Sequence, residues 1–179
     1  FDQDMFGEYT GAGVIFGASG GVMEAALRTV TDVLTKEDLT NLDYHAVRGE
    51  EGVKEASLKI GDMTVNVAVA HSMVLAKPLL EEIKNGTSKY HFIEIMGCPG
   101  GCVNGGGQSY VNALTRNSGF DWKQARAKAL YDEDLALPVR KSHKNSQIQK
   151  LYADFLGEPN SEKAHHLLHT HYTRKERFK

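Results

Sequence analysis

The sequence is poor in cysteine and proline, with two cysteines and four prolines among 179 residues. So few cysteines exclude a disulfide-stapled scaffold and favour a metal or redox site in a reducing compartment, which we expect to be the cytoplasm. The sequence also lacks an excess of charge of either sign, because its formal net charge is only −2. This charge gives no reason to expect nucleic acid or an anionic membrane as a partner. The sequence has no apolar run as long as a membrane span, so membrane insertion is not expected.

The pattern of apolar residues predicts an α/β fold in a single domain, because helical and strand-like segments alternate along the chain. The expected elements are a helix over 20–35, a strand over 42–49, a hairpin of strands over 55–60 and 63–71, a helix over 72–85, a strand over 90–96, and helices over 122–131, 146–156 and 161–172. The segment 6–17 is rich in glycine and favours extended structure. Ser19 is the expected N-cap of the first helix.

The apolar stripe expected on that first helix consists of Val22, Ala26, Val30, Val33 and Leu34, which recur at helical spacing. In the hairpin, Gly61-Asp62 has the composition of a two-residue turn. The strand over 90–96 is apolar enough for burial.

Both cysteines lie in the stretch "HFIEIMGCPGGCVNGGGQS", which also holds six glycines between Gly97 and Gly107. Proline favours the first position of a helix, so Pro99 makes Cys98 a candidate cap, with Cys102 one turn further on. Glycines cost helix stability but let backbone N–H groups crowd around a bulky anion. An iron–sulfur cluster is such an anion.

Other interpretations of the two thiols remain open at this point. They are either small buried hydrophobic side chains, a redox dithiol, or half of a zinc site completed by histidines. The histidines available for zinc are His165, His166, His169 and His171, although this pattern is more typical of helix-surface or packed histidines. An iron–sulfur cubane normally takes four protein ligands, so with two cysteines it would borrow ligands from elsewhere.

Several long motifs in the right order resemble the C-terminal half of the FeFe-hydrogenase (iron-only hydrogenase) catalytic domain. The stretch "EIMGCPGGCVNGGGQ" resembles its third cysteine signature, and "GVIFGASGGVMEAALRT" resembles the conserved stretch before it. The segment from "KALYDEDLALPVRKSHKNS" to "HHLLHTHY" resembles the end of the same domain. The resemblance runs from Phe6 to Tyr172 and implies one lobe of that domain over 1–179, a small twisted mixed sheet flanked by helices.

The resemblance implies that Cys98 and Cys102 are metal ligands of the H-cluster, which is a 4Fe–4S cubane plus a two-iron unit with CO, CN and dithiolate ligands. Cys98 would ligate the cubane, and Cys102 would also bridge it to the two-iron unit. Met96 would pack against that unit. The sequence departs from the family pattern at Gly97, which is usually Ala, and at Ser109, which is usually Pro.

The same resemblance implies that Phe16 and Gly17 line the pocket of the two-iron unit and that Val22 belongs to its apolar wall. Without the family, Phe16, Val22 and Met96 would be interpreted as ordinary core residues. The basic residues Arg140, Lys141, Lys144 and Lys150 either dock an acidic redox partner or lie on a solvated surface.

The family's first two signatures, with the other cubane cysteines and the proton relay, do not occur in this sequence. The chain opens on "FDQDMFGEYTG" without an initiator Met. It is therefore expected to be either a natural split subunit or the trailing segment of a longer protein. The expected partners are hydrogenase subunits that carry the remaining H-cluster cysteines and electron-transfer iron–sulfur clusters or flavin.

The implied activity is 2H⁺ + 2e⁻ ⇌ H₂, with no catalytic proton-relay residue in this chain. The alternative is a hydrogenase-like iron–sulfur protein, a sensor or assembly factor without the two-iron unit.

Overall fold

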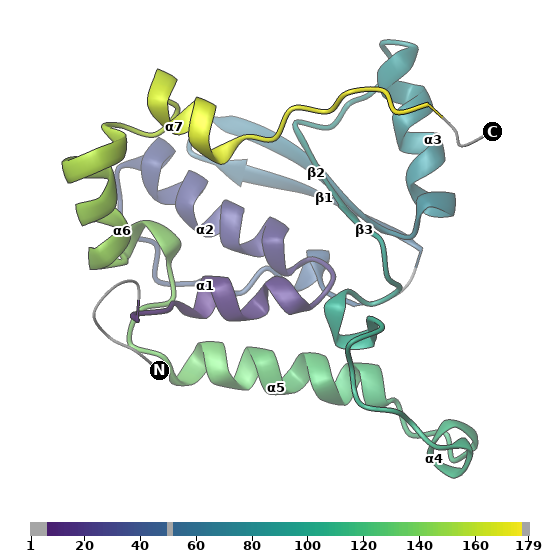
Figure 1. Cartoon of the computed structure of the whole chain (residues 1–179). Coiled ribbons are helices and arrows are strands. Elements are labelled where there is room, and N and C mark those ends of the chain that lie inside the picture. The colour runs from purple at the N-terminus through teal and green to yellow at the C-terminus, as the bar shows by residue number, and fades with distance from the viewer. Residues whose placement is uncertain (1–6, 50–51, 177–179) are drawn as a thin grey trace. The chain divides into compact units, whose positions relative to one another are not determined.

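The computed structural model describes residues 7–49 and 52–176, which fall into two compact units. The larger unit is Tyr9–Ser142 and contains the sheet (Figure 1). The smaller unit combines the N-terminal segment up to Glu8 with the chain from His143 onward.

A mixed three-stranded sheet organises the larger unit, in the order β1-β2-β3. Strands β1 (Val53–Ile60) and β2 (Met63–His71) form an antiparallel hairpin, and Ile60 pairs with Met63 around the predicted Gly61-Asp62 turn. Strand β3 (Phe92–Met96) runs parallel to β2, with His71 opposite Met96. This confirms the predicted α/β fold with a small mixed sheet flanked by helices.

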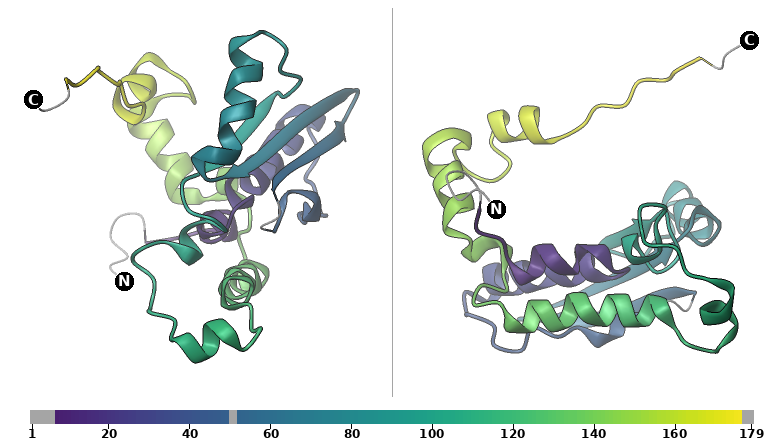
Figure 2. Two further views of the ribbon diagram at one scale, coloured as in Figure 1. Left: turned by 90° about the vertical axis from the view of Figure 1, so that its right-hand side faces the viewer. Right: turned by 60° about the horizontal axis from the view of Figure 1, so that its bottom comes forward.

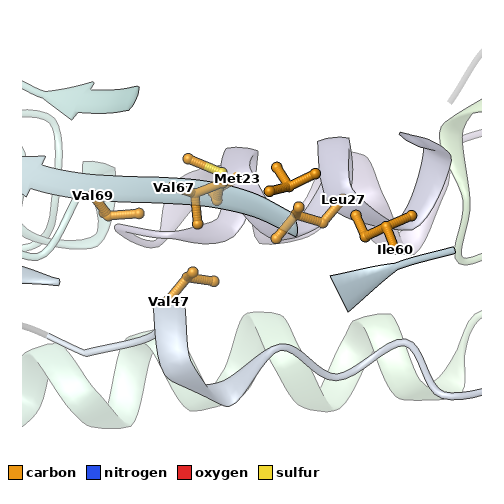
Figure 3. Packing of buried hydrophobic residues seen from close by; sticks show 7 residues of the cluster. Met23, Leu27, Val47, Ile60, Val67 and Val69 are labelled. Atoms are coloured by element: carbon orange, nitrogen blue, oxygen red, sulfur yellow. The ribbon is translucent and has the colours of Figure 1, made fainter. Parts of the chain in front are cut away.

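The central strand β2 is buried on both faces, because its side chains alternate between two helices. Val65, Val67 and Val69 point toward α2 (Gly21–Thr35), where they join Met23, Leu27, Val47 and Ile60 in one apolar cluster (Figure 3). Ala68 and Ala70 point to the opposite face and pack with Ala76 and Leu79 of α3 (Met73–Lys84). The core therefore has a helix on each side of strand β2. This strand pairs with β3, which leads into the cysteine stretch.

The buried face of α2 differs from the predicted apolar stripe. The helix buries Met23, Glu24, Leu27 and Arg28, whereas Val30, Val33 and Leu34 are exposed. The stripe prediction was wrong for Val30, Val33 and Leu34, because in this helix a charged pair is buried against a third helix.

That third helix is α5 (Trp122–Ala136), and the short α1 (Gly11–Val14) packs against both α2 and α5. The extended structure expected for 6–17 was wrong over 11–17, because α1 and the 3₁₀ helix η1 (Ile15–Gly17) occupy these residues. Thr10, the N-cap of α1, is extended, and Phe6 lies outside the described residues. Gly11 allows close helix packing: a Cβ there would lie 1.9 Å from Asp134 Oδ1.

The strand expected over 42–49 was also wrong, because His45–Val47 forms a 3₁₀ helix, η2. Val47 enters the α2 cluster, and Arg48 donates to carboxylate oxygens of both Glu24 and Asp43. These contacts with distant residues override the local β preference.

For Arg140 and Lys141, both interpretations of the basic residues, docking of a partner and a solvated surface, were wrong. Arg140 and Lys141 are largely buried and ion-paired, Arg140 with Asp134 and Lys141 with Asp32 at 2.7 Å. Lys150 is exposed and pairs with Asp154 one helical turn away.

The remaining elements of the larger unit are η3 (Cys102–Asn104) and α4 (Ala113–Asn117). The chain from Ser142 onward forms η4 (Ser142–Lys144), α6 (Ser146–Leu151), the π-helical turn η5 (Tyr152–Leu156) and α7 (Glu162–Leu168), seen from two further sides in Figure 2. Ser161 caps α7 by accepting from the Ala164 N–H, as predicted. In the parts of the chain that the structure describes, helices are too short or too polar to cross a membrane.

Candidate metal centre

The cysteine loop begins where β3 ends and is closed by its own hydrogen bonds. Gly101 N–H donates to the Cys98 carbonyl at 3.0 Å, and Gly100 has a φ of +82°. Proline followed by a glycine with positive φ is the composition of a type II turn, so Cys98 starts a turn and the predicted helix cap was wrong. Cys102 instead opens the 3₁₀ helix η3, after which Gly105 N–H donates to its carbonyl at 2.9 Å.

This loop docks directly on the backbone between η1 and α2. Ser19 N–H donates to the Gly100 carbonyl at 2.9 Å. Gly101 approaches so closely that a Cβ would lie 2.6 Å from Ser19 N and 2.7 Å from the Gly17 carbonyl oxygen, and its φ is +96°. The structure thus brings together the two segments that carry the predicted site residues, although they are far apart in the sequence.

Both thiols are free and exposed. A Cβ at Gly105 would lie 3.8 Å from Cys98 Sγ and 3.7 Å from Cys102 Cα, so the loop curls around Gly105. At Gly97, Gly106 and Gly107 a Cβ would meet no atom of the described chain within 4 Å. These three glycines of the cysteine loop therefore adjoin open space.

The ligand set around the thiols is incomplete within the described chain. Over residues 7–49 and 52–176, groups of three or more His, Cys, Asp or Glu side chains that would hold a metal ion are absent. In the smaller unit, His165 and His169 pack ring on ring, with centroids 4.2 Å apart. Cys98 and Cys102 therefore belong to no such group within the described chain, and the histidines considered for zinc do not form a metal site with one another.

The remaining predicted site residues lie at the edges of this region. Phe16 is 45% exposed, while Val22 and Met96 are half-buried, so the ordinary core interpretation does not hold for Phe16. Gly17 has a packing reason of its own, because a Cβ there would lie 2.7 Å from Leu130 Cδ1 on α5. The pocket roles of these four residues stay predictions.

Sequence reasoning missed Glu94, the one residue of β3 that is classed as buried. Its carboxylate accepts from Gly20 N–H and Met23 N–H, both at 2.7 Å, and so caps α2 from another strand. Ser19 was the wrong cap: its hydroxyl is buried and has no hydrogen-bond partner among the described residues. Burial raises the pKa of Glu94, against the opposing effect of the two backbone donors. The signal in the sequence that could have indicated this role is the single carboxylate inside the apolar run "FIEIM".

A buried ion cluster, Glu24, Arg28, Asp134 and Arg140, lies between α2 and α5. The Arg28 guanidinium makes five hydrogen bonds, to Leu42 O, Asp134 Oδ1, Asp134 Oδ2, Glu24 Oε1 and Arg140 O. That number equals its N–H donors, so the group is fully satisfied. Burial opposes the charge on Asp134, but hydrogen bonds from Arg28 and Arg140 outweigh it and lower the pKa of Asp134.

A pocket of about 690 Å³ opens beside the cysteine loop, between Gly100, Ser19 and the α5 side chains Lys128, Tyr131 and Asp132. Lys128 is ion-paired with Asp132. Arg48, Lys54 and Asp121 also line the pocket, so its wall carries charged side chains of both signs.

Comparison with known proteins gives two family matches in order along the chain. Residues 1–106 match "Iron only hydrogenase large subunit, C-terminal domain", and residues 121–175 match "Iron hydrogenase small subunit". The first match contains the whole sheet and both cysteines.

Named relatives agree with these matches. The chain is 46% identical over 178 residues to "NADP-reducing hydrogenase subunit HndD" of Solidesulfovibrio fructosivorans, covering 99% of this chain and 29% of the relative. It is 46% identical over 169 residues to "Iron hydrogenase 1" of Clostridium pasteurianum, covering 93% and 29%. The chain therefore spans under a third of the length of these relatives.

A more distant relative and a solved structure complete the comparison. "Cytosolic Fe-S cluster assembly factor narfl" of Danio rerio is 30% identical over 154 residues, covering 86% of this chain and 36% of the relative. A variant of the [FeFe]-hydrogenase HydA1 from Chlamydomonas reinhardtii superposes with a TM-score of 0.66 at 39% identity, covering 93% of this chain and 47% of that one.

Proposed function

The chain belongs to the family of iron-only hydrogenase C-terminal domains, and on this premise we propose that it supplies two cysteine ligands to the H-cluster of an FeFe-hydrogenase. The reaction is 2H⁺ + 2e⁻ ⇌ H₂. The observation that carries the proposal is the cysteine loop: two exposed thiols on one curled loop, docked against 17–19 and facing space that glycines leave open.

Each residue of the loop has a distinct role in this proposal. Cys98 and Cys102 would both hold the 4Fe–4S cubane of the H-cluster, and Cys102 would also hold the two-iron unit. When bound, the H-cluster supplies the redox chemistry, with CO, CN and dithiolate ligands on its two-iron unit. The protein contributes ligand orientation and a dry, shaped environment.

Apolar side chains around the loop form the wall that excludes water. Met96 leads into the loop, and its carbonyl accepts from Ser72 N–H at 2.7 Å, which fixes the end of β3. Phe16 and Val22 lie shortly before and after the docked residues 17–19 in the sequence, and Gly17 lets that backbone pack on α5. The exposed fraction of Phe16, 45%, leaves its ring available to a bound group.

The remaining functions fall to polypeptide that is not in this sequence. A partner protein or a preceding segment supplies the other cubane ligands, the proton relay and the electron-transfer iron–sulfur clusters or flavin. On this proposal residues 1–179 are one lobe of the catalytic domain, and the complex works in the cytoplasm.

The test is to express the chain with the complementary hydrogenase segment and its maturation factors, and to compare Cys102→Ser with Val74→Ala at an exposed position of α3. Cys102→Ser should abolish hydrogen evolution and reduce the iron content, because a serine hydroxyl is a poor ligand for iron–sulfur clusters. Val74→Ala should retain both. Unchanged hydrogen evolution in Cys102→Ser would refute the proposal.

The second candidate is an iron–sulfur assembly factor or sensor without the two-iron unit. Its support is the 30% identity to a protein named as an assembly factor, against 46% to proteins named as hydrogenases. Infrared spectra of the matured complex distinguish the two candidates. Bands of metal-bound carbonyl and cyanide support the hydrogenase, and a cubane without them supports the second candidate.

A further inference from the structure

Strand β3 lies at the edge of the sheet, and the buried residue in it is the charged one. Glu94 is 6% exposed, whereas its apolar neighbours Phe92 and Ile95 are 40% and 39% exposed. A carboxylate withdrawn from water is costly unless hydrogen bonds replace the lost hydration. The buried carboxylate of Glu94 is therefore tolerated only if hydrogen-bond donors of the protein contact it.

Those partners are the first amides of α2. Gly20 N–H donates to Oε1 and Met23 N–H to Oε2, both at 2.7 Å, so each carboxylate oxygen holds one amide. Gly20 is the N-cap of α2, has a φ of +91° and carries no side chain that would cap the helix itself. A negative charge is also favourable at this end of the helix dipole.

The cap joins two segments that both belong to the candidate metal centre. Glu94 lies on the strand that leads into Met96 and Cys98, and its donors begin the helix that follows Phe16 and Gly17. The second attachment point is the hydrogen bond from Ser19 N–H to Gly100 O at 2.9 Å. A cap from within α2 would satisfy the same amides, but it would not connect the helix to the cysteine loop.

We propose that Glu94 is a positioning residue that fixes the cysteine loop relative to the start of α2 by holding Gly20 and Met23 from the strand before the loop. The orientation of the thiols is thereby set before any group binds. The identity of the group that the loop binds rests on the proposed function. The positioning role of Glu94 does not depend on it.

The test uses Glu94→Gln in the full chain, with Cd²⁺ alone as a thiol-binding probe. Glutamine has the same shape but one acceptor oxygen, so its NH₂ group would face one of the two backbone donors. Amide exchange at Gly20 and Met23 should become about tenfold faster, the factor expected for loss of one hydrogen bond to a charged group. The ultraviolet cadmium–thiolate titration should show Cd²⁺ affinity lower by about the same factor.

The matched control is Leu79→Ala, which destabilises the α3 side of the core but removes neither a loop residue nor a hydrogen bond of the cap. Its unfolding midpoint should fall, while Cd²⁺ affinity stays at the parent value. Glu94→Asp keeps two acceptor oxygens on a shorter side chain and should recover part of the affinity. If Glu94→Gln keeps the parent affinity, or loses no more than Leu79→Ala, Glu94 has no positioning role.

Failure of the proposed function gives a different result. In that case Cd²⁺ binding would still depend on Glu94, but the matured complex would lack carbonyl and cyanide bands. In a loaded complex with those bands, Glu94→Gln should broaden or shift the cubane's electron paramagnetic resonance signal, and Leu79→Ala should leave it unchanged.

Discussion

The buried ion cluster and the cysteine loop differ in how far their functional groups find partners within the chain. In the cluster, every N–H of the Arg28 guanidinium has a protein acceptor, and the Arg28, Glu24 and Asp134 side chains have no exposed surface. In the loop, both thiols are exposed and three glycines adjoin open space. The Arg28 guanidinium thus finds all of its partners within the chain, whereas the two thiols of the loop are exposed and belong to no group of three or more potential metal ligands among the described residues.

This difference has a physical basis in the cost of burial. A buried charge without a partner is strongly destabilising, so a folded chain must supply all of its partners internally. An exposed thiol has no comparable free-energy cost, because it stays in contact with water. The following predictions test that contrast, starting with the largest effect.

Arg28→Met should lower the free energy of unfolding by about 3–5 kcal/mol, because it leaves the buried Glu24 and Asp134 carboxylates without their shared cation. Urea denaturation measures the change. Lys128→Met on the exposed face of α5 serves as the matched control and should cost no more than about 0.5 kcal/mol. Equal costs for the two variants would contradict the view that the ion cluster is tightly coupled.

Gly101→Ala should cost about 1–3 kcal/mol from its positive φ alone, and more from contact with Ser19 N and the Gly17 carbonyl. Gly106→Ala should change stability by less than about 1 kcal/mol, since a Cβ there meets nothing within 4 Å of the described chain. In the loaded complex, Gly106→Ala should reduce iron content without a matching loss of stability. Full iron content would show that Gly106 does not provide clearance.

Acid should weaken the ion cluster. Since the pKa of Asp134 is lowered in the folded chain, its contribution to stability is present above the unfolded carboxyl pKa, about 3.9, and is lost as the pH falls through the lowered folded value. Denaturant unfolding between pH 7 and pH 3 measures the slope. Asp134→Asn should be less stable at pH 7 and should show a smaller loss toward pH 3; an unchanged slope would exclude Asp134 as its source.

Cys98→Ser should have the smallest effect on the chain without cofactor, within about 0.5 kcal/mol, because the thiol is exposed. The same variant should lose iron in the complex assembled with the complementary segment. A large loss of stability in the isolated chain would mean that the thiol packs within the fold, which would reduce the contrast between loop and ion cluster.

Local patterns were sufficient wherever one segment determined the outcome. The Gly61-Asp62 turn, the helix near 72–85, the strand leading to Met96 and the Ser161 cap were all predicted, because turn chemistry, periodicity and capping act over a few residues. The cysteine loop was found the same way, although its helix cap was wrong: Gly100 adopts a positive φ, and the backbone turns there.

Predictions failed where a distant partner decided the local structure. The apolar stripe of α2 missed the buried pair Glu24 and Arg28, because their partners Asp134 and Arg140 are far away in the sequence. Ser19 was chosen as cap because the true cap, Glu94, lies on another strand.

By itself, then, the sequence determined the alternation of helices and strands, the family and the two thiols with their glycines, because periodicity and contiguous motifs are local properties. Only the tertiary structure decided which face of α2 is buried, which carboxylate caps it and how the cysteine loop rests on residues 17–19. Those outcomes depend on pairing charges and amides across the fold, because a buried charge or amide without a partner is costly.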